Sequence, residues 1–132
     1  RNSQARIVIV DDIGGLGLRD DSETESFMYK LKGAASASET VVFLLSNITL
    51  KKFRFDDRPV LSDFGSDSLY RFCDIVQFVY RDNYDDDFPS GIQKVEIITA
   101  KSMVSTKPST TILAALPDYP VICDLGESTT LD

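Results

Sequence analysis

Hydrophobic residues occur along the chain mostly in short continuous runs, which is a pattern typical of buried β-strands. The first two runs cover residues 7–10 and 41–45, and both are apolar at every position. Strands of this kind are typical of the centre of a parallel sheet whose faces are covered by helices. We therefore expect a parallel core in the first part of the chain.

The segment between these two runs has the spacing of an amphipathic helix. Its apolar residues recur every three or four positions, at Phe27, Met28, Leu31 and Ala35. This spacing predicts a helix over about residues 22–38. Ser22 and Glu25 have the spacing of a capping box, so the helix is expected to begin at Ser22. Strand, helix and strand in this order predict a right-handed crossover and a parallel pair.

The second half of the chain predicts strands with no helix between them. The strand candidates are residues 75–80, 95–101, 112–116 and 121–125, with a turn at 102–109 and a short Pro-containing connection at 117–120. Strands joined by such short connections must pair antiparallel. We therefore predict an α/β fold with one mixed sheet, in which parallel central strands are followed by antiparallel C-terminal edge strands.

Composition limits the class of protein. With 132 residues, of which 42% are hydrophobic, the chain is expected to form one domain with a real core. The apolar runs are strand-length and the N-terminus is unlike a signal peptide, so we expect a cytoplasmic protein with no membrane partner. Because the first residue is Arg1, we also expect the chain to be a piece of something longer.

Charge and residue types argue against several chemistries. The absence of histidine excludes catalysis by a Ser-His-Asp triad and, with only Cys73 and Cys123, makes a zinc site implausible. Both cysteines lie among apolar residues and are expected to be buried, reduced thiols. The net charge of −7 disfavours DNA binding by the whole chain, because phosphate neutralisation needs a basic face.

Six segments, in order along the chain, resemble DnaB-type replicative DNA helicases. Residues 58–64 (RPVLSDF) resemble the family's Arg-Pro-x-x-Ser-Asp-Leu loop, and the runs ending at Tyr80-Arg81-Asp82 and at Ala100-Lys101 resemble its strands ending in Tyr-Arg-Asp and Ala-Lys. Upstream, residues 7–11, 30–35 and 42–49 resemble its Walker B strand, its Leu-Lys-x-Leu-Ala helix and its strand ending in Ser-Gln. The resemblance covers almost the whole chain. It implies a single, partial RecA-like P-loop NTPase domain over residues 1–132, from the C-terminal part of the motor domain.

The resemblance implies roles for three residues near a nucleotide. Asp11 ends a central parallel strand, where open α/β sheets bind ligands, and would hold the magnesium ion of ATP. Asn47 replaces a glutamine that senses nucleotide or DNA, and is one methylene shorter. Lys101 matches a lysine that reaches the neighbouring subunit's nucleotide in a ring hexamer. On the residues alone, an acidic pair after a strand is more often a solvated turn.

Other positions depart from the family pattern. Met103 replaces the arginine finger, so no side-chain charge is available there to stabilise the transition state. Gly65, Ser66 and Ser68 match the loop that lines the channel for single-stranded DNA, but this loop has no basic residue here, and Asp67 opposes contact with phosphates.

A G-x-x-x-x-G-K-[ST] phosphate loop occurs nowhere in the sequence, and no lysine follows the glycines of residues 14–17. The resemblance therefore places the start of the chain after that loop. ATP and Mg²⁺ are expected to bind in a complete parent and not tightly to this chain alone, which should not hydrolyse ATP by itself. We expect a fragment or degenerate relative of the helicases with no catalytic residue of its own.

Two other classes of function remain open at this point. One is a non-catalytic module that docks on a helicase or replication complex, favoured by Met103 and the acidic charge. The other is a response-regulator receiver domain, with acidic residues after the first strand, Asp57 as phosphoacceptor and a late Lys107-Pro108 pair. The residues before Asp57 do not form the buried apolar strand that a phosphoacceptor requires.

A small phosphodonor distinguishes the receiver from the other two classes. We expect the chain, incubated with acetyl phosphate and Mg²⁺, to show no increase in mass, because Asp57 lacks a strand to position it. Intact-mass spectrometry measures this directly. A phosphoryl adduct that disappears in Asp57→Asn would contradict the expectation and establish a receiver.

Overall fold

The computed structural model describes residues 6–49, 57–81, 93–116 and 121–129, with side chains up to Cys123. The chain divides into two compact units. Unit 1 comprises residues 1–50 and 62–73, and unit 2 comprises residues 51–61 and 74–132. Each unit has its own sheet and is described separately, and the prediction of a single partial domain stays a prediction.

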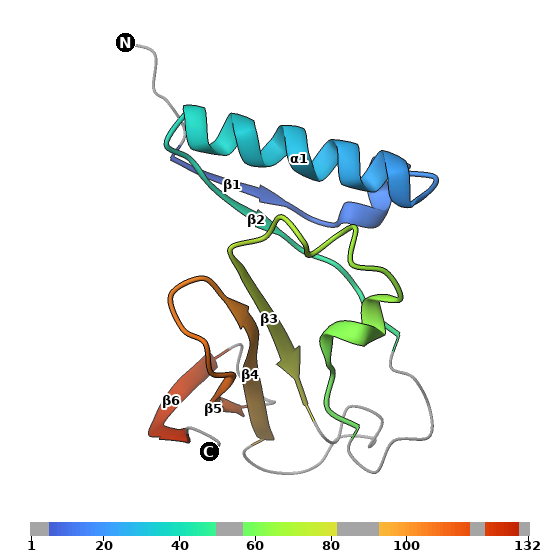
Figure 1. Cartoon of the computed structure of the whole chain (residues 1–132). Helices are drawn as coiled ribbons and strands as arrows, with labels where there is room; N and C mark the ends of the chain where they lie inside the picture. The colour runs from blue at the N-terminus through green and yellow to red at the C-terminus, as the bar shows by residue number, and fades with distance from the viewer. Residues whose placement is uncertain (1–5, 50–56, 82–92, 117–120, 130–132) are drawn as a thin grey trace. The chain divides into compact units, whose positions relative to one another are not determined.

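Unit 1 is built on the predicted strand–helix–strand. Strands β1 (Ile7–Val10) and β2 (Val41–Leu44) pair in parallel, with Ile7 opposite Val41 and Val10 opposite Leu44. Helix α1 (Asp21–Ala37) connects them and lies along the pair (Figure 1). Met28 on this helix is 4% exposed, which confirms the predicted apolar helix face. The strands, the helix and the parallel pairing agree with the sequence prediction.

The start of α1 differs from the prediction by one residue, and its cap by two. The N-cap is Asp20, whose side chain accepts a hydrogen bond from the backbone N–H of Glu23 (2.8 Å). Glu23 in turn accepts from the backbone N–H of Arg19 (3.0 Å). Ser22 therefore lies inside the helix, and the capping box predicted from Ser22 and Glu25 is wrong. Aspartate caps a helix as well as serine does, so the earlier acid replaced the expected cap.

One face of the β1–β2 pair is exposed, contrary to the expectation of strands buried on both sides. Because side chains alternate along a strand, Ile7, Ile9, Val41 and Phe43 share one face, and these residues are 51–65% exposed. On the other face, Val10, Val42 and Leu44 are half-buried, whereas Val8 is 40% exposed. Within the described part of unit 1, α1 is the one α-helix, and it can cover only one face of this sheet.

A network of polar contacts fastens residues 62–73 to α1 within unit 1. Ser68 is 6% exposed, and its hydroxyl donates to Asp21 Oδ1 (3.1 Å) in the first turn of α1. Arg71 pairs with Glu25 (2.7 Å) and with Asp67 (3.0 Å). The ring of Phe72 packs edge-on against Tyr29. The short 3₁₀ helix η2 (Leu61–Phe64) opens this segment.

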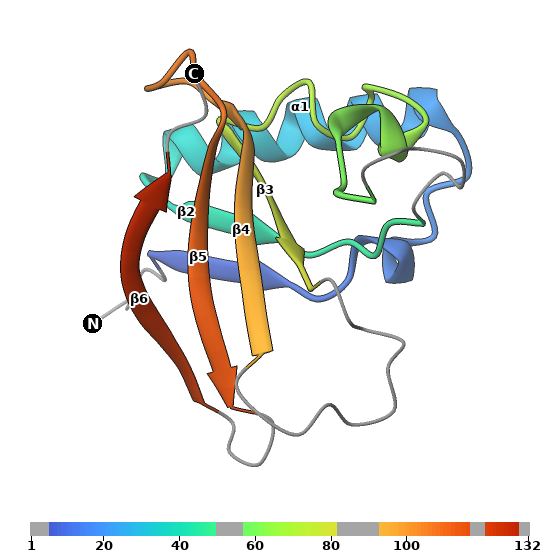
Figure 2. The ribbon, with the colours of Figure 1, turned by 90° about the horizontal axis from the view of Figure 1, so that it is seen from below.

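Unit 2 contains a four-stranded antiparallel sheet in the order β3–β4–β5–β6 (Figure 2). The strands are β3 (Ile75–Tyr80), β4 (Gln93–Ser102), β5 (Ser109–Leu116) and β6 (Val121–Thr129). Each predicted strand is present and its antiparallel pairing is confirmed. Val76 and Phe78 are buried and alternate with exposed neighbours, which shows that β3 is covered on one face.

The α/β class is confirmed, and the parallel and antiparallel strands are both present. They are hydrogen-bonded as two separate sheets, whereas the sequence indicated one mixed sheet. No helix among the described residues is long and apolar enough to cross a membrane. Cys73 is half-buried, but Cys123 is exposed, so the expectation of a buried thiol is wrong at that position.

An ion cluster at Glu96 joins the 57–60 segment to the sheet of unit 2. Glu96 is 4% exposed, and its carboxylate accepts two hydrogen bonds from Arg58 (2.7 and 2.8 Å). Lys94 contacts the same carboxylate at 2.6 Å. Hydrogen bonding to Arg58 outweighs burial and lowers the pKa of Glu96 from its ordinary 4.5 to about 2. The pair therefore stabilises the fold while Glu96 is ionised.

Removing Arg58 should destabilise the chain in a pH-dependent way. We expect Arg58→Ala to lower the free energy of unfolding by about 1–2 kcal/mol at pH 7, which is less than for a fully buried pair because Arg58 is half exposed. The folded-state pKa of Glu96 is depressed, so this contribution is complete above pH 4.5 and is lost as pH falls through about 2. Urea unfolding of Arg58→Ala and of the unsubstituted chain, at pH 7 and at about pH 2, measures this contribution.

Lys94→Ala is the matched control, because the side chains of Lys94 and Arg58 are similarly exposed, 49% and 44%. It should cost less, since lysine lacks the two-pronged contact of the guanidinium. Equal losses in the two variants, or a loss for Arg58→Ala that does not shrink toward pH 2, would contradict this account of the cluster.

The contact between Ser68 and Asp21 should also contribute measurably to stability. Ser68→Ala removes a buried hydrogen bond and is expected to cost about 1 kcal/mol in thermal or urea unfolding. Ser62→Ala, at an exposed serine of the same segment, should stay within about 0.5 kcal/mol of the parent. Indistinguishable unfolding of the two variants would show that the network does not fasten the segment.

Candidate functional site

The candidate site lies at the carboxyl ends of β1 and β2 in unit 1. The backbone N–H of Leu45 donates to Val10 (2.9 Å), and that of Ile13 donates to Leu45 (2.9 Å). The parallel pairing thus continues past both strands and brings Asp11, Asp12 and Asn47 to the same edge. This is the position at which open α/β sheets place their ligands.

Asp12 uses both of its carboxylate oxygens as hydrogen-bond acceptors at this edge. Its Oδ1 accepts from the backbone N–H of Gly15 (3.1 Å) and caps the 3₁₀ helix η1 (Ile13–Leu16). Its Oδ2 accepts from Nδ2 of Asn47 (3.2 Å). A Cβ at Gly14 would lie 3.3 Å from Oδ1 of Asp12, so glycine there leaves room for the carboxylate. Asp12 therefore connects the turn after β1 to the end of β2.

Asp11, the residue expected to bind magnesium, is exposed and follows β1 directly. The structure gives its carboxylate no hydrogen-bond partner among the described residues, whereas both oxygens of Asp12 are occupied. No group of three or more acidic, histidine or cysteine residues able to hold a metal occurs in the described part of the chain. A single accessible carboxylate fits Mg²⁺, which is commonly held by one or two carboxylates, waters and substrate phosphates.

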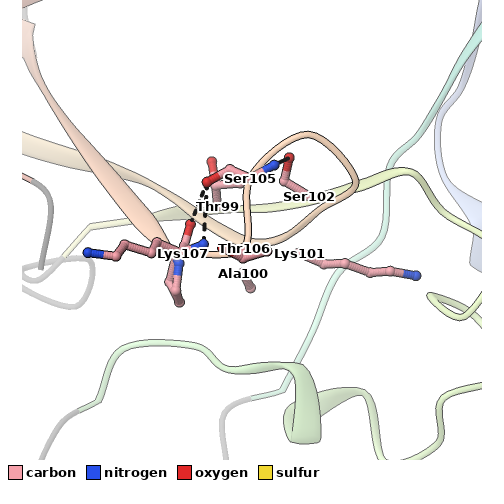
Figure 3. A pocket seen from close by; sticks show the side chains of 8 residues that line it. Thr99, Ala100, Lys101, Ser102, Ser105, Thr106 and Lys107 are labelled. Atoms are coloured by element: carbon pink, nitrogen blue, oxygen red, sulfur yellow. Dashed lines mark hydrogen bonds between the residues drawn. The ribbon is translucent and has the colours of Figure 1, made fainter. Parts of the chain in front are cut away.

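The β4–β5 hairpin of unit 2 carries Lys101 and Met103. A hollow of about 300 Å³ on this hairpin is lined by residues 99–102 and 105–108 (Figure 3). Lys101 and Lys107 extend from it in opposite directions, so their ammonium groups do not converge on one ligand (Figure 3). Met103 is 73% exposed and its backbone N–H donates to Asp74 (2.9 Å). The hairpin presents an apolar side chain where the resemblance implies an arginine.

Hydrogen bonds within the hairpin fix its turn. The hydroxyl of Ser102 accepts from the backbone N–H groups of Val104 and Ser105 (3.2 and 3.3 Å). The hydroxyl of Ser105 accepts from the N–H of Lys107 and donates to its carbonyl (3.3 and 3.2 Å). The hydroxyls of Ser102 and Ser105 therefore stabilise the turn. Lys101, beside the turn, is half-buried.

The residues expected to face DNA lie in the segment that is fastened to α1. Gly65 is exposed and has φ of +78°, a conformation that favours glycine. Ser66 accepts from the backbone N–H of Ser68 (3.1 Å) and donates to its hydroxyl (3.0 Å), while Ser68 donates to Asp21. This internal network must open before the hydroxyl of Ser68 can donate to a phosphate.

The structure thus brings Asp11 and Asn47 to one edge, and leaves Lys101 in unit 2. In the sequence, Asp12 is recognisable only as part of an acidic pair, and its contact with Asn47 is not predicted. The sequence does contain a signal for the capping role of Asp12. Asp12 precedes Gly14 and Gly15, and an aspartate before glycines is a common N-cap. The partnership with Asn47 depends on pairing between strands far apart in sequence.

Comparison with solved structures gives two similarities that cover nearly the whole chain. The chain is similar to a structure described as an ATPase domain, with 28% identity and a TM-score of 0.76 over 95% of this chain. It is also similar to a DnaB-like replicative helicase, described with its interactions with primase, with 31% identity and a TM-score of 0.76 over 95% of this chain. The chain spans 46% and 32% of those two proteins.

No family model matches the sequence, and no curated protein matches it either. The resemblance read from the short motifs is nevertheless confirmed by the solved structures, since these similarities cover nearly all of the chain at identities of 28% and 31%. The chain is similar, over almost its whole length, to part of the RecA-like ATPase domain of DnaB-like replicative helicases.

Proposed function

We propose that this chain is part of the motor of a replicative DNA helicase that uses ATP to move along single-stranded DNA in the cytoplasm. The observation that carries the proposal is the similarity to an ATPase domain and to a DnaB-like replicative helicase, each over 95% of the chain. The position of Asp11 and Asn47 at the carboxyl edge of a parallel strand pair supports it. The chain alone lacks a phosphate loop, so activity belongs to the complete protein.

In that protein, Asp11 would hold the Mg²⁺ that accompanies ATP. The ion would neutralise charge on the phosphates during transfer to water. The exposed carboxylate of Asp11 can accept hydrogen bonds from the waters of the ion, and Asn47 lies at the same edge to contact the nucleotide or its hydration shell. The negative charge of Asp11 favours the cation and disfavours direct contact with a phosphate.

The β4–β5 hairpin would meet a neighbouring subunit in a ring hexamer. Lys101 supplies a positive charge there, while Met103 supplies none. An arginine at such a position raises the rate by stabilising the charge of the transition state. With methionine in its place, the proposed motor is slower than one with a finger or takes its cation from elsewhere.

Contact with single-stranded DNA would involve residues 65–68. The exposed Gly65 leaves the backbone accessible at this turn, whereas the hydroxyls of Ser66 and Ser68 are engaged within unit 1. Asp67 and the net charge of −7 oppose a phosphate backbone. The proposed DNA contact is therefore weak in this subunit.

A non-catalytic module that docks on a helicase or replication complex is the second candidate. The observation that favours it is the tip of the β4–β5 hairpin, where Met103 and Val104 are 73% and 92% exposed. Large exposed apolar side chains of this kind suit a contact with another protein better than contact with ATP. Two observations argue against a receiver domain. Asp57 is exposed in a segment without secondary structure, and the strands of unit 2 are antiparallel.

Hydrolysis of ATP by the complete reading frame that encodes this chain tests the proposal. We expect a phosphate loop upstream and hydrolysis stimulated by single-stranded DNA. Asp11→Asn should reduce the rate by at least about 100-fold, because the magnesium ion contributes several kcal/mol to the transition state. Asp57→Asn, at another exposed aspartate, is the matched control and should leave the rate unchanged. A reading frame without a phosphate loop, or equal rates for Asp11→Asn and the parent, would favour the docking module.

A further inference from the structure

The hydrogen bond between Asp12 and Asn47 determines which way the amide of Asn47 faces. An ionised carboxylate can only accept hydrogen bonds, so the atom of Asn47 that meets Oδ2 of Asp12 must be the nitrogen, Nδ2. The carbonyl oxygen Oδ1 then lies on the side of the amide that Asp12 does not occupy. The Asn47 residue as a whole is exposed.

Asp12 itself is held in place from the other side. Its Oδ1 accepts from the N–H of Gly15, and the backbone of Ile13 is bonded to Leu45, two residues before Asn47. Asp12 is half-buried, whereas Asp11 and Asn47 are exposed. The carboxylate is therefore a fixed support, and Asn47 is the group that it orients.

We propose that Asp12 is a positioning residue that fixes Asn47 with Oδ1 outward, so that this strand edge offers acceptor oxygens to the water shell of a divalent cation. The inference rests on the proposed function, and it specifies what the edge recognises. Waters bound to Mg²⁺ donate hydrogen bonds, and Mg²⁺ retains several of them. The carboxylate of Asp11 and Oδ1 of Asn47 accept such bonds, whereas phosphate oxygens require donors.

A side chain one methylene shorter than glutamine thus keeps a role at this edge. The shorter amide is within reach of Asp12, which restrains it, and a restrained acceptor loses less conformational entropy on binding. Partners that orient a metal-binding group in this way typically change metal affinity by 10–100-fold when they are removed. Asp12 belongs to this class of residue because it acts through Asn47.

The test is a double-mutant cycle on the full chain with Mn²⁺ as the probe. Asn47→Leu removes the acceptor, and Asp12→Glu moves the carboxylate away from Asn47; neither substitution changes the net charge. Binding is followed by paramagnetic broadening of the Gly14 and Gly15 amide signals in about 0.15 M salt, which screens distant charges. Before Mn²⁺ is added, unchanged amide signals from α1 and β2, which lie in the same unit as the substitutions, show that each variant remains folded.

Each single substitution is expected to weaken Mn²⁺ binding by about tenfold. If Asp12 acts through Asn47, the double variant binds within about twofold of either single variant, because residues in one network are not additive. A double variant weakened by the product of the two effects, or a single variant that binds like the parent, overturns the proposal. If Asp12→Glu does not fold, Asn47→Gln decides instead, since its longer amide leaves Asp12 and the cap intact. It should also bind about tenfold more weakly, and parent-like binding overturns the proposal.

Asp11→Asn separates this inference from the proposed function. We expect it to abolish the broadening at Gly14 and Gly15. Weak binding is sufficient for this test, because paramagnetic broadening also reports a site that is only partly occupied. If Mn²⁺ broadens neither signal in the unsubstituted chain, or if Asp11→Asn changes nothing, the metal site of the proposed function fails and the role of Asp12 fails with it. If Asp11→Asn abolishes binding while the cycle is additive, only the role of Asp12 is overturned.

Discussion

The parallel pairing of β1 with β2 is the constraint on which the candidate site depends. Parallel strands end at the same edge, so Asp11 and Asn47, which are 36 positions apart in the sequence, come to one side of unit 1. The hydrogen bonds of Leu45 to Val10 and of Ile13 to Leu45 extend this pairing into the turn. Antiparallel pairing would have placed the two side chains at opposite ends of the strands.

The remaining polar contacts secure segments that have little regular structure. In unit 1, Ser68 and Arg71 bind acidic residues of α1 and fasten the segment after η2. In unit 2, Arg58 reaches a buried glutamate of β4. Both contacts use acidic side chains of a chain whose net charge is −7. The acidic composition therefore contributes to the fold as well as opposing contact with phosphate.

Much of the fold could be predicted from the sequence because its signals are local. The runs at 7–10 and 75–80 and the helical spacing around Met28 each predicted the right element. The cap at Asp20 was missed because two acids and a serine compete for the same position within three residues. The separation into two sheets was missed because strand length and spacing do not specify which edges hydrogen-bond.

The candidate site was predictable only in part. A position after a parallel strand indicates where Asp11 lies, and the family resemblance supplied its chemistry. The role of Asp12 follows from a contact with Asn47 across 35 residues, which no local pattern encodes. Likewise, the engagement of Ser68 with Asp21 spans 47 residues and changes what that serine can offer to DNA. Long-range pairs of this kind become visible only in the folded chain.

In the proposed site, the edge formed by Asp11, Asp12 and Asn47 holds a hydrated divalent cation. A crystal structure of the chain with Mn²⁺, located by its anomalous scattering, tests it most directly. We expect an ion beside Asp11, with a bound water that donates to Oδ1 of Asn47 while Nδ2 of Asn47 still donates to Asp12. Manganese located elsewhere, or an Asn47 amide that has left Asp12, would contradict it.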